Sequence, residues 1–169
     1  MSHPDNGKKP QSPADTRHVL AAASLGGHWI QLLRLTAGMH RRGCQVDYLS
    51  THDRCATMIP RGSRFFRLGD FSRTDAWRLF PALWRAIRIV RRLHPDVVVS
   101  TGAAPGLVTI IAARLCGVRA VWVDSIANVE QLSMCGRLAS RIASETYTQW
   151  PELAGGRVRY AGNVLGDDA

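Results

Sequence analysis

The sequence predicts an α/β domain with a mostly parallel sheet. Short apolar runs typical of buried strands alternate along the chain with amphipathic segments of helical period. Two of these runs, ending near Ser24 and Ser100, pass directly into glycine-containing turns that open helices. This alternation indicates strand–helix–strand units, in which helices join parallel strands.

Each predicted strand follows from its own apolar run. The first is the run before Ser24, and the fourth contains three consecutive valines before Ser100. The others are shorter runs between turns. Strands are expected at residues 18–23, 46–50, 65–68, 96–100, 120–124, 146–148 and 158–161.

Four helices are expected between these strands. Gly43, Pro95 and Gly117 end the first three, because glycine and proline interrupt the helical pattern. Pro81 is expected in the first turn of the main part of the second helix, and Ser133 is expected to cap the fourth. The helices are expected at residues 28–42, 74–94, 105–116 and 133–143.

The length of 169 residues indicates one domain. Residues 1–17 are polar and contain three prolines, so they predict a disordered tail before a domain at 18–169. No signal peptide is visible, and no apolar stretch reaches the ~20 residues of a membrane span. Four separated cysteines and six histidines show no metal-binding spacing, so neither a metal nor a cofactor is expected.

The charge balance is the unusual part of the composition. The chain has 22 Lys and Arg against 13 Asp and Glu, a formal net charge of +9. Such a surplus favours an anionic partner: nucleic acid, phospholipid headgroups or a phosphorylated substrate. No nucleic-acid recognition motif is present, so nucleic acid is not the expected partner.

The first glycine-containing turn, from Ser24 to His28, has the composition of a phosphate-binding helix start. Gly26 and Gly27 allow close approach of the backbone and leave amide N–H groups at the positive end of the helix. The same positive end favours a neutral His28 ring, which can accept a proton. A tight turn with His28 as a cap explains these residues equally well. The spacing is not GxGxxG, so the dinucleotide-binding fingerprint is absent.

The second turn runs from Ser100 to Gly106. Thr101 supplies a hydroxyl, and Gly102 and Gly106 supply bare backbone. With the strand order 3-2-1-4-5, the first and fourth strands are neighbours, and both turns lie side by side at their carboxyl ends. Ligands bind at this switch point in open α/β sheets. A strand-to-helix turn without a ligand is the alternative.

The segment from Asp124 to Asn128 follows the fifth predicted strand. It adds a carboxylate and an amide at the same edge of the sheet. Either side chain has the chemistry to orient a sugar hydroxyl. A simple Asp-Ser turn explains the segment without a ligand.

The second predicted helix, at 74–94, has a basic face. Its expected apolar stripe is Phe80, Leu83, Ile87 and Val90, with Trp77 and Trp84 at the border. Its arginines at helical spacing are Arg78, Arg85, Arg88 and Arg92. Arginine with bordering tryptophan is typical of a helix on an anionic membrane surface. An ordinary amphipathic helix, with its stripe in the core and its arginines in water, is the alternative.

Five segments carry a family resemblance between about His18 and Leu165. They are SLGGHWIQLLRL, VVVSTGAAPGLVTIIAARLCGVRAVWVDSIANV, SMCGRLASRIA, TQWPEL and RVRYAGNVL. In this order they resemble the PssD-like subunits of bacterial exopolysaccharide glycosyltransferases. Their eukaryotic relatives form the asparagine-linked-glycosylation protein fourteen family.

The resemblance implies a single Rossmann-like domain, equivalent to the N-terminal, acceptor-binding half of a GT-B glycosyltransferase of the MurG type. It implies transfer of a hexosyl or N-acetylhexosaminyl group from a UDP-sugar to a polyprenyl-diphosphate-linked saccharide in polysaccharide biosynthesis. A second subunit would carry the UDP-sugar site and would be needed for activity. The implied location is cytoplasmic and peripheral, on the inner face of the cell membrane.

The motif match also assigns roles to residues. His28 corresponds to the histidine proposed as a base in MurG-like enzymes, and Gln149 and Trp150 belong to a QWxEL element that is structural or faces the partner. The acceptor and its phosphates are expected at Ser24, Gly26, Gly27, Thr101, Gly102, Ala103, Gly106, Asp124 and Asn128. The departures from the family pattern are Asp124, Asn128 and Ser144, where glutamate, arginine and an acidic residue are common.

Two other functions fit part of the sequence. A non-catalytic scaffold that docks an active partner to the membrane would need the arginines of the second helix but not His28. A free-standing nucleotide-binding protein would bind a UDP-sugar or dinucleotide alone, and the missing GxGxxG counts against it.

Overall fold

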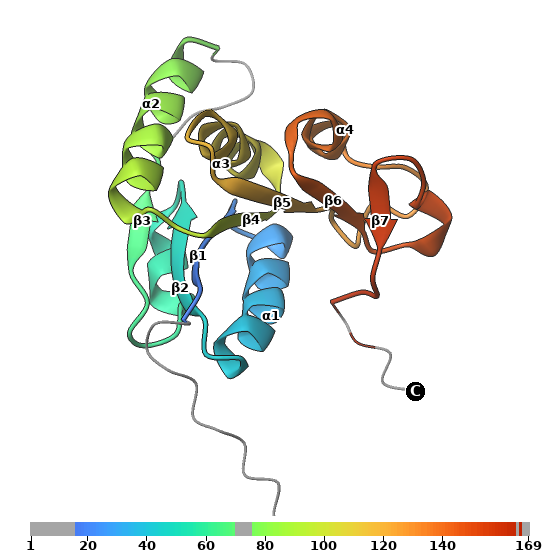
Figure 1. Cartoon of the computed structure of the whole chain (residues 1–169), viewed down its shortest axis with the longest axis horizontal. Helices are drawn as coiled ribbons and strands as arrows, with labels where there is room; N and C mark the ends of the chain where they lie inside the picture. The colour runs from blue at the N-terminus through green and yellow to red at the C-terminus, as the bar shows by residue number, and fades with distance from the viewer. Residues whose placement is uncertain (1–15, 70–75, 165, 167–169) are drawn as a thin grey trace, which may run out of the picture.

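Seven parallel strands form the centre of the molecule (Figure 1). The computed structural model describes residues 16–69, 76–164 and 166, with the backbone alone for 76–78. Within these residues the strand order is β3-β2-β1-β4-β5-β6-β7, and every neighbouring pair is parallel. The strands are β1 (His18–Ala23), β2 (Gln45–Ser50), β3 (Phe65–Arg67), β4 (Val97–Gly102), β5 (Arg119–Val123), β6 (Glu145–Thr148) and β7 (Val158–Tyr160).

Helices connect most consecutive strands and cover the sheet unequally. They are α1 (Gly27–Arg41), α2 (Ala76–Leu93), α3 (Ala103–Leu115) and α4 (Met134–Ile142), with the short 3₁₀ helices η2 (Asp53–Met58) and η3 (Pro151–Leu153). The helices α2, α3 and α4 lie on one face, and α1 lies on the other (Figure 1). Because the β6–β7 connection contains only η3, no described helix covers β5, β6 and β7 on the α1 face.

The alternation of side chains along β1 shows how the two layers are built. Leu20 and Ala22 point into the cluster under α2, α3 and α4, whereas Val19, Ala21 and Ala23 point into the cluster under α1. All five side chains are almost completely buried. A strand buried on both faces needs a continuous apolar run, which is the pattern that predicted it.

The predicted strand order is confirmed and extended by β6 and β7. Every predicted strand and helix is present with small shifts at its ends, and Ser133 caps α4 by accepting a hydrogen bond from the Gly136 N–H. The 3₁₀ helices η2 and η3 were not expected. Pro81 lies inside α2 rather than in its first turn. Most of the predicted tail lies outside the described residues.

The apolar stripe predicted for α2 is partly wrong. Phe80 is 73% exposed, and the residues that enter the core are Ala82, Ala86 and Val90. The helix α2 packs mainly against α3, with Ala82, Ala86 and Val90 inside the cluster and Phe80 outside it. Trp84 is also exposed, at 61%. The side chains of Trp77 and Arg78 lie outside the described part of the chain.

Two absences apply to the described residues. No described helix is both long and apolar enough to cross a membrane. No described group of three or more His, Cys, Asp or Glu side chains is arranged to hold a metal ion. No disulfide bond joins the four cysteines.

Asp47 in β2 is a buried charge that joins three segments. Its carboxylate accepts hydrogen bonds from the N–H and guanidinium of Arg64, at 2.5–3.1 Å, and from the His18 ring, at 2.8 Å. Burial alone would raise the pKa of Asp47, but the hydrogen bonds from Arg64 and His18 outweigh it and hold the pKa below its ordinary value. The carboxylate therefore ties β1 and β2 to the segment before β3.

We expect Asp47→Asn to lower the free energy of unfolding at neutral pH by about 1–3 kcal/mol, because it leaves donors of Arg64 and His18 without an acceptor. The folded carboxyl has the lower pKa, so its contribution is present above about pH 4 and is lost as pH falls through the folded value. Urea unfolding from pH 7 to pH 3 measures this. The difference between wild type and variant should shrink in acid, and a constant difference would contradict the account. Asp53→Asn, in an exposed ion pair with Arg67, is the control and should change stability little.

Candidate functional site

The two glycine-containing turns meet through a reciprocal pair of hydrogen bonds. The β1–α1 turn contributes His28, whose Nδ1 lies 3.1 Å from the carbonyl oxygen of Thr101. The β4–α3 turn contributes the Thr101 hydroxyl, which donates to the carbonyl oxygen of His28 at 2.7 Å. Ala23 at the end of β1 pairs with Gly102 at the end of β4. The predicted convergence of the turns is therefore present.

This contact decides which nitrogen of His28 carries the proton. A carbonyl oxygen only accepts, so a neutral His28 bonded to Thr101 must have its proton on Nδ1. Nε2 then keeps its lone pair, and it makes no hydrogen bond to any described residue. The ring is half-buried. The arrangement presents a fixed imidazole with one free acceptor nitrogen, which suits a general base.

Gly102 is required by the position of the His28 ring. A Cβ atom at residue 102 would lie 2.4 Å from Nδ1 and 2.6 Å from Cε1 of His28. Its φ of +145° is also unfavourable for other residues. Ala103 follows with a φ of +62°, which is strained for a residue with a side chain. This strain lies at the turn that holds the ring.

The space in front of the α1 N-terminus is open. Gly26 and Gly27 are exposed, and a Cβ atom at either would meet nothing within 4 Å. The α1 and α3 N-caps, Gly26 and Gly102, make no side-chain capping hydrogen bond, so first-turn amides of both helices remain for an incoming acceptor. Ser24 is half-buried in the same turn. Anions bind at helix starts of this kind.

Gly106 has a packing role that sequence reasoning did not identify. A Cβ atom at residue 106 would lie 1.9 Å from the Ser100 hydroxyl oxygen and 3.5 Å from the Ala22 carbonyl oxygen. The residue is buried between α3 and the sheet. Its bare backbone serves close helix–strand packing, so the structure does not bring it to the open edge with Gly26 and Gly27.

The expectation for Asp124 disagrees with the structure. Asp124 is 1% exposed, and its carboxylate accepts four hydrogen bonds, from the Trp122 indole, the Ser133 N–H and hydroxyl, and the Asn128 amide. A carboxylate has about four acceptor positions, so none remains for a sugar hydroxyl. Asp124 instead fixes the loop that leads into α4. Asn128 is half-buried, and its amide nitrogen serves the same loop.

Two buried glutamines hold this loop against the site. Gln31, one helical turn after His28, donates to the Asp124 carbonyl at 3.0 Å and accepts from the Ile126 N–H at 3.2 Å. Gln149 donates to the same carbonyl and accepts from the Val164 N–H at 2.8 Å. The role of Gln149 is thus structural. The signal that could have revealed Gln31 is its place at the helical spacing of the buried residues of α1, next to Leu32.

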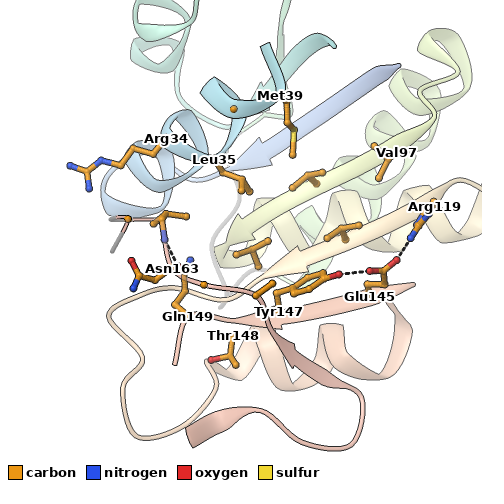
Figure 2. Close-up of a pocket in the computed structure, with 18 of the residues that line it drawn as sticks. Arg34, Leu35, Met39, Val97, Arg119, Glu145, Tyr147, Thr148, Gln149 and Asn163 are labelled. Atoms are coloured by element: carbon orange, nitrogen blue, oxygen red, sulfur yellow. Dashed lines mark hydrogen bonds and ion pairs between the residues drawn. The ribbon is translucent and has the colours of Figure 1, made fainter. Parts of the chain in front are cut away.

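A groove of about 670 Å³ opens beside α1, over parts of β4, β5 and β6 (Figure 2). Its floor is apolar, with Val97, Val99, Val121 and Val123 from β4 and β5. Arg34 and Met39 of α1 lie along one side, and residues 161–164 and 166 also line the groove. None of the residues of the two turns lines this groove, so it is a second feature, distinct from the His28 site.

Glu145, Tyr147 and Arg119 at the rim of this groove are paired with one another. Glu145 accepts hydrogen bonds from the Tyr147 hydroxyl, at 2.5 Å, and from the Arg119 guanidinium (Figure 2). These donors lower the pKa of Glu145, and the bond to Glu145 raises the pKa of Tyr147. The carboxylate is therefore satisfied within the chain. Of the floor, Val99 is buried in the cluster under α1, and Val97, Val121 and Val123 are half-buried.

The outer side of α2 forms a third feature, which we call the basic–aromatic face. It consists of Phe80, Trp84, Arg85, Arg88, Arg91 and Arg92, all exposed. The Arg88 guanidinium lies over the Trp84 ring, 4.6 Å from its centre. A hollow of about 910 Å³ between α2 and β3 is lined by the four arginines of this face and by Phe65 and Phe66. Cationic and aromatic groups thus share one exposed surface.

Comparison with known proteins agrees with this arrangement. The family model for Glycosyltransferase Family 4 matches residues 25–124, which include the second turn and the first turn after Ser24. The UDP-N-acetylglucosamine transferase subunit ALG14 of Eremothecium gossypii is 31% identical over 167 residues, covering 82% of this chain and 75% of the relative. The subunit of the same name from Mus musculus is 23% identical and covers 84% of this chain and 79% of the relative.

Longer enzymes match over one part only. A UDP-N-acetylglucosamine–N-acetylmuramyl-(pentapeptide) pyrophosphoryl-undecaprenol N-acetylglucosamine transferase of Acidovorax sp. is 34% identical over 160 residues, covering 83% of this chain and 38% of the enzyme. The crystal structure of Acinetobacter baumannii MurG superposes with a TM-score of 0.75 at 19% identity, covering 87% of this chain and 46% of MurG. The chain thus spans less than half of these enzymes, and the predicted fold, the N-terminal half of a MurG-like GT-B enzyme, is confirmed.

We expect Gly102→Ala to displace the His28 ring and to lower the free energy of unfolding by about 1–3 kcal/mol, because it combines steric overlap with an unfavourable φ. Gly27→Ala is the matched control. Its Cβ atom enters open space, and its stability should stay close to that of the wild type. Urea unfolding and crystal structures of both variants measure the two effects. An unmoved ring with full stability in Gly102→Ala would contradict the positioning role.

Proposed function

Because the chain belongs to Glycosyltransferase Family 4, we propose that it is the acceptor-binding subunit of a two-component glycosyltransferase. The enzyme moves a hexosyl or N-acetylhexosaminyl group from a UDP-sugar to a polyprenyl-diphosphate-linked saccharide in polysaccharide biosynthesis. Support for the donor and acceptor classes comes from the names of the relatives, which include a UDP-N-acetylglucosamine donor and a pyrophosphoryl-undecaprenol acceptor.

The observation that carries the proposal is the fixed His28 ring between two uncapped helix starts. With Nδ1 bonded to Thr101, Nε2 of His28 takes the proton from the acceptor hydroxyl as that oxygen attacks the sugar. The proton moves to Nε2, the new bond forms at the anomeric carbon, and the bond from that carbon to the UDP oxygen breaks. The charge on the ring is stabilised through the same hydrogen bond to Thr101.

The diphosphate of the acceptor binds in front of the two helix starts. Gly26 and Gly27 provide open backbone at α1, and Gly102 and Ala103 provide the corresponding turn at α3. Two helix N-termini at the same edge of the sheet favour a dianion more than one N-terminus does. The site therefore selects the charged part of the acceptor and leaves the donor to the partner.

A second subunit completes the enzyme. The chain matches less than half of single-chain relatives such as the Acidovorax transferase, and the ALG14 relatives are themselves named as subunits. The half-buried valines in the floor of the groove beside α1 support the same proposal, because both faces of a parallel sheet are normally buried. The partner supplies the UDP-sugar site, and it covers apolar surface that this chain leaves open.

The basic–aromatic face of α2 docks the subunit to the inner, cytoplasmic face of the cell membrane. Phe80 and Trp84 are exposed apolar groups of the kind that enter the interfacial region of a bilayer. The four neighbouring arginines attract anionic headgroups, each contributing about 1 kcal/mol near the surface. Docking brings the site to a lipid-linked acceptor without a membrane-spanning helix in the described chain.

We expect sugar transfer to need both subunits. The assay compares the chain, the α/β protein that co-purifies with it, and their mixture, with UDP-N-acetylglucosamine and a polyprenyl-diphosphate saccharide. Only the mixture should be active, and full activity of the chain alone would contradict the two-component proposal.

In the same assay, His28→Ala should lower kcat by about 10²–10⁴-fold, as expected for loss of a general base. His94→Asn, at an exposed histidine outside the site, should leave kcat unchanged. A fully active His28→Ala mixture would favour the non-catalytic docking scaffold instead.

Charge reversal on α2 should weaken membrane binding without unfolding the chain. We expect Arg85→Glu with Arg88→Glu to reduce binding to phosphatidylglycerol vesicles by at least tenfold, because two attractions of about 1 kcal/mol each become repulsions. Vesicle co-sedimentation at fixed salt measures the change. Arg42→Glu with Arg61→Glu, two exposed arginines outside α2, is the control pair. Equal losses in both pairs would indicate a general charge effect rather than a docking face.

A further inference from the structure

The helix α4 presents an exposed aliphatic stripe that the fold does not use. Met134, Leu138 and Ile142 are 54%, 48% and 37% exposed. Their spacing of four residues places them one above another on a single side of the helix. Three large aliphatic side chains aligned on one side of a nine-residue helix are a surface feature that calls for a partner.

The other side of α4 already makes the core contacts. Cys135 and Ala139 are 8% and 0% exposed and belong to the cluster beneath α2, α3 and α4. Gly136 is buried against the Asp124 carboxylate, where a Cβ atom would lie 2.5 Å from an oxygen. The helix is thus held by small residues, and its large apolar residues are free to contact something outside the chain.

The helices on this face of the sheet, α2, α3 and α4, carry only positive charges around the stripe. Arg137 and Arg141 of α4 are exposed beside it. The sequences of α2, α3 and α4 contain no Asp or Glu, and their described side chains include seven arginines: Arg85, Arg88, Arg91, Arg92, Arg114, Arg137 and Arg141. A helix layer that carries only cations matches an anionic surface over its whole width.

The stripe continues toward α3 and belongs to the same layer as the basic–aromatic face. The Arg114 guanidinium donates to the Ile142 carbonyl oxygen at 3.1 Å, which joins the ends of α3 and α4. The next residue, Leu115, is 64% exposed. The helix α3 packs between α2 and α4 on one face of the sheet (Figure 1). Exposed apolar and basic groups therefore extend across the layer.

We propose that α4 is a second lipid-contacting helix. Met134, Leu138 and Ile142 enter the boundary between headgroups and acyl chains, and Arg137 and Arg141 contact anionic headgroups. This inference rests on the proposed membrane docking of α2. A second contact through α4 changes the geometry of that docking. One contact leaves the subunit free to pivot on the membrane, whereas two contacts on either side of α3 fix its orientation.

A lipid surface explains the composition of the stripe better than a protein partner does. Aliphatic residues flanked by arginine, with no acidic residue on the helix, are the pattern of an interfacial amphipathic helix. A protein partner would have to present a matching acidic surface to this cationic rim. The groove on the opposite face of the sheet, over β4 and β5, already offers a surface suited to a protein.

The test is co-sedimentation of the full chain with phosphatidylglycerol–phosphatidylcholine vesicles and with pure phosphatidylcholine vesicles. We expect Leu138→Asp with Ile142→Asp to lower the partition coefficient for the anionic vesicles roughly tenfold, and the milder Leu138→Ser to lower it less. Arg137→Gln with Arg141→Gln should weaken binding to anionic vesicles only. Met58→Asp is the matched control, because Met58 is 41% exposed in η2, on the α1 side of the sheet. This variant should bind vesicles as the wild type does. Circular dichroism checks that each variant is folded.

The outcomes separate this inference from the proposed function. If the α4 variants bind vesicles as the wild type does while the α2 charge-reversal pair does not bind, the role of α4 is overturned and the docking of α2 remains. Unchanged vesicle binding with loss of the co-purifying subunit assigns the stripe to a protein interface and also overturns it. If the wild type does not bind anionic vesicles, membrane docking is removed from the proposed function, and the proposed lipid contact of α4 is overturned as well.

Discussion

The site depends on one reciprocal contact, in which His28 and Thr101 each bond the other's backbone carbonyl oxygen. The contact joins two turns that are 73 residues apart in sequence, and it sets both the orientation and the tautomer of the imidazole. Gly102 makes it possible, because any side chain there would overlap the ring. A free nitrogen is thereby held beside two helix starts that can bind an anion.

A second constraint is the unequal cover of the sheet. On one face, α2, α3 and α4 form a complete layer whose helices carry arginine and no acidic residue. On the other face, α1 packs on β1, β2 and β4, and a groove beside it leaves Val121 and Val123 of β5 half-buried. Both faces of a parallel sheet require burial, so the two sides suit different partners, a membrane on one and a protein on the other. The site lies at the edge between them.

The sequence predicted the strand order and the meeting of the two turns, because both follow from apolar runs and from parallel topology. It could not predict side-chain partners, which depend on distances between segments. Asp124 looked like a free carboxylate until the structure placed four donors around it, and Gly106 looked like a ligand contact until it proved to lie against Ser100. Phe80 was assigned to the core by spacing alone, but the buried side of α2 runs through Ala82, Ala86 and Val90, and Phe80 is exposed. The exopolysaccharide subgroup and the roles of the site residues in catalysis stay predictions.

The most direct test of the central claim is the protonation pattern of His28, measured by long-range proton–nitrogen correlation in the folded chain at a pH where the ring is neutral. The account predicts a proton on Nδ1 and none on Nε2, because the Thr101 carbonyl oxygen can only accept. A spectrum with the proton on Nε2 would contradict it, since the nitrogen required to accept the proton of the sugar acceptor would already be occupied.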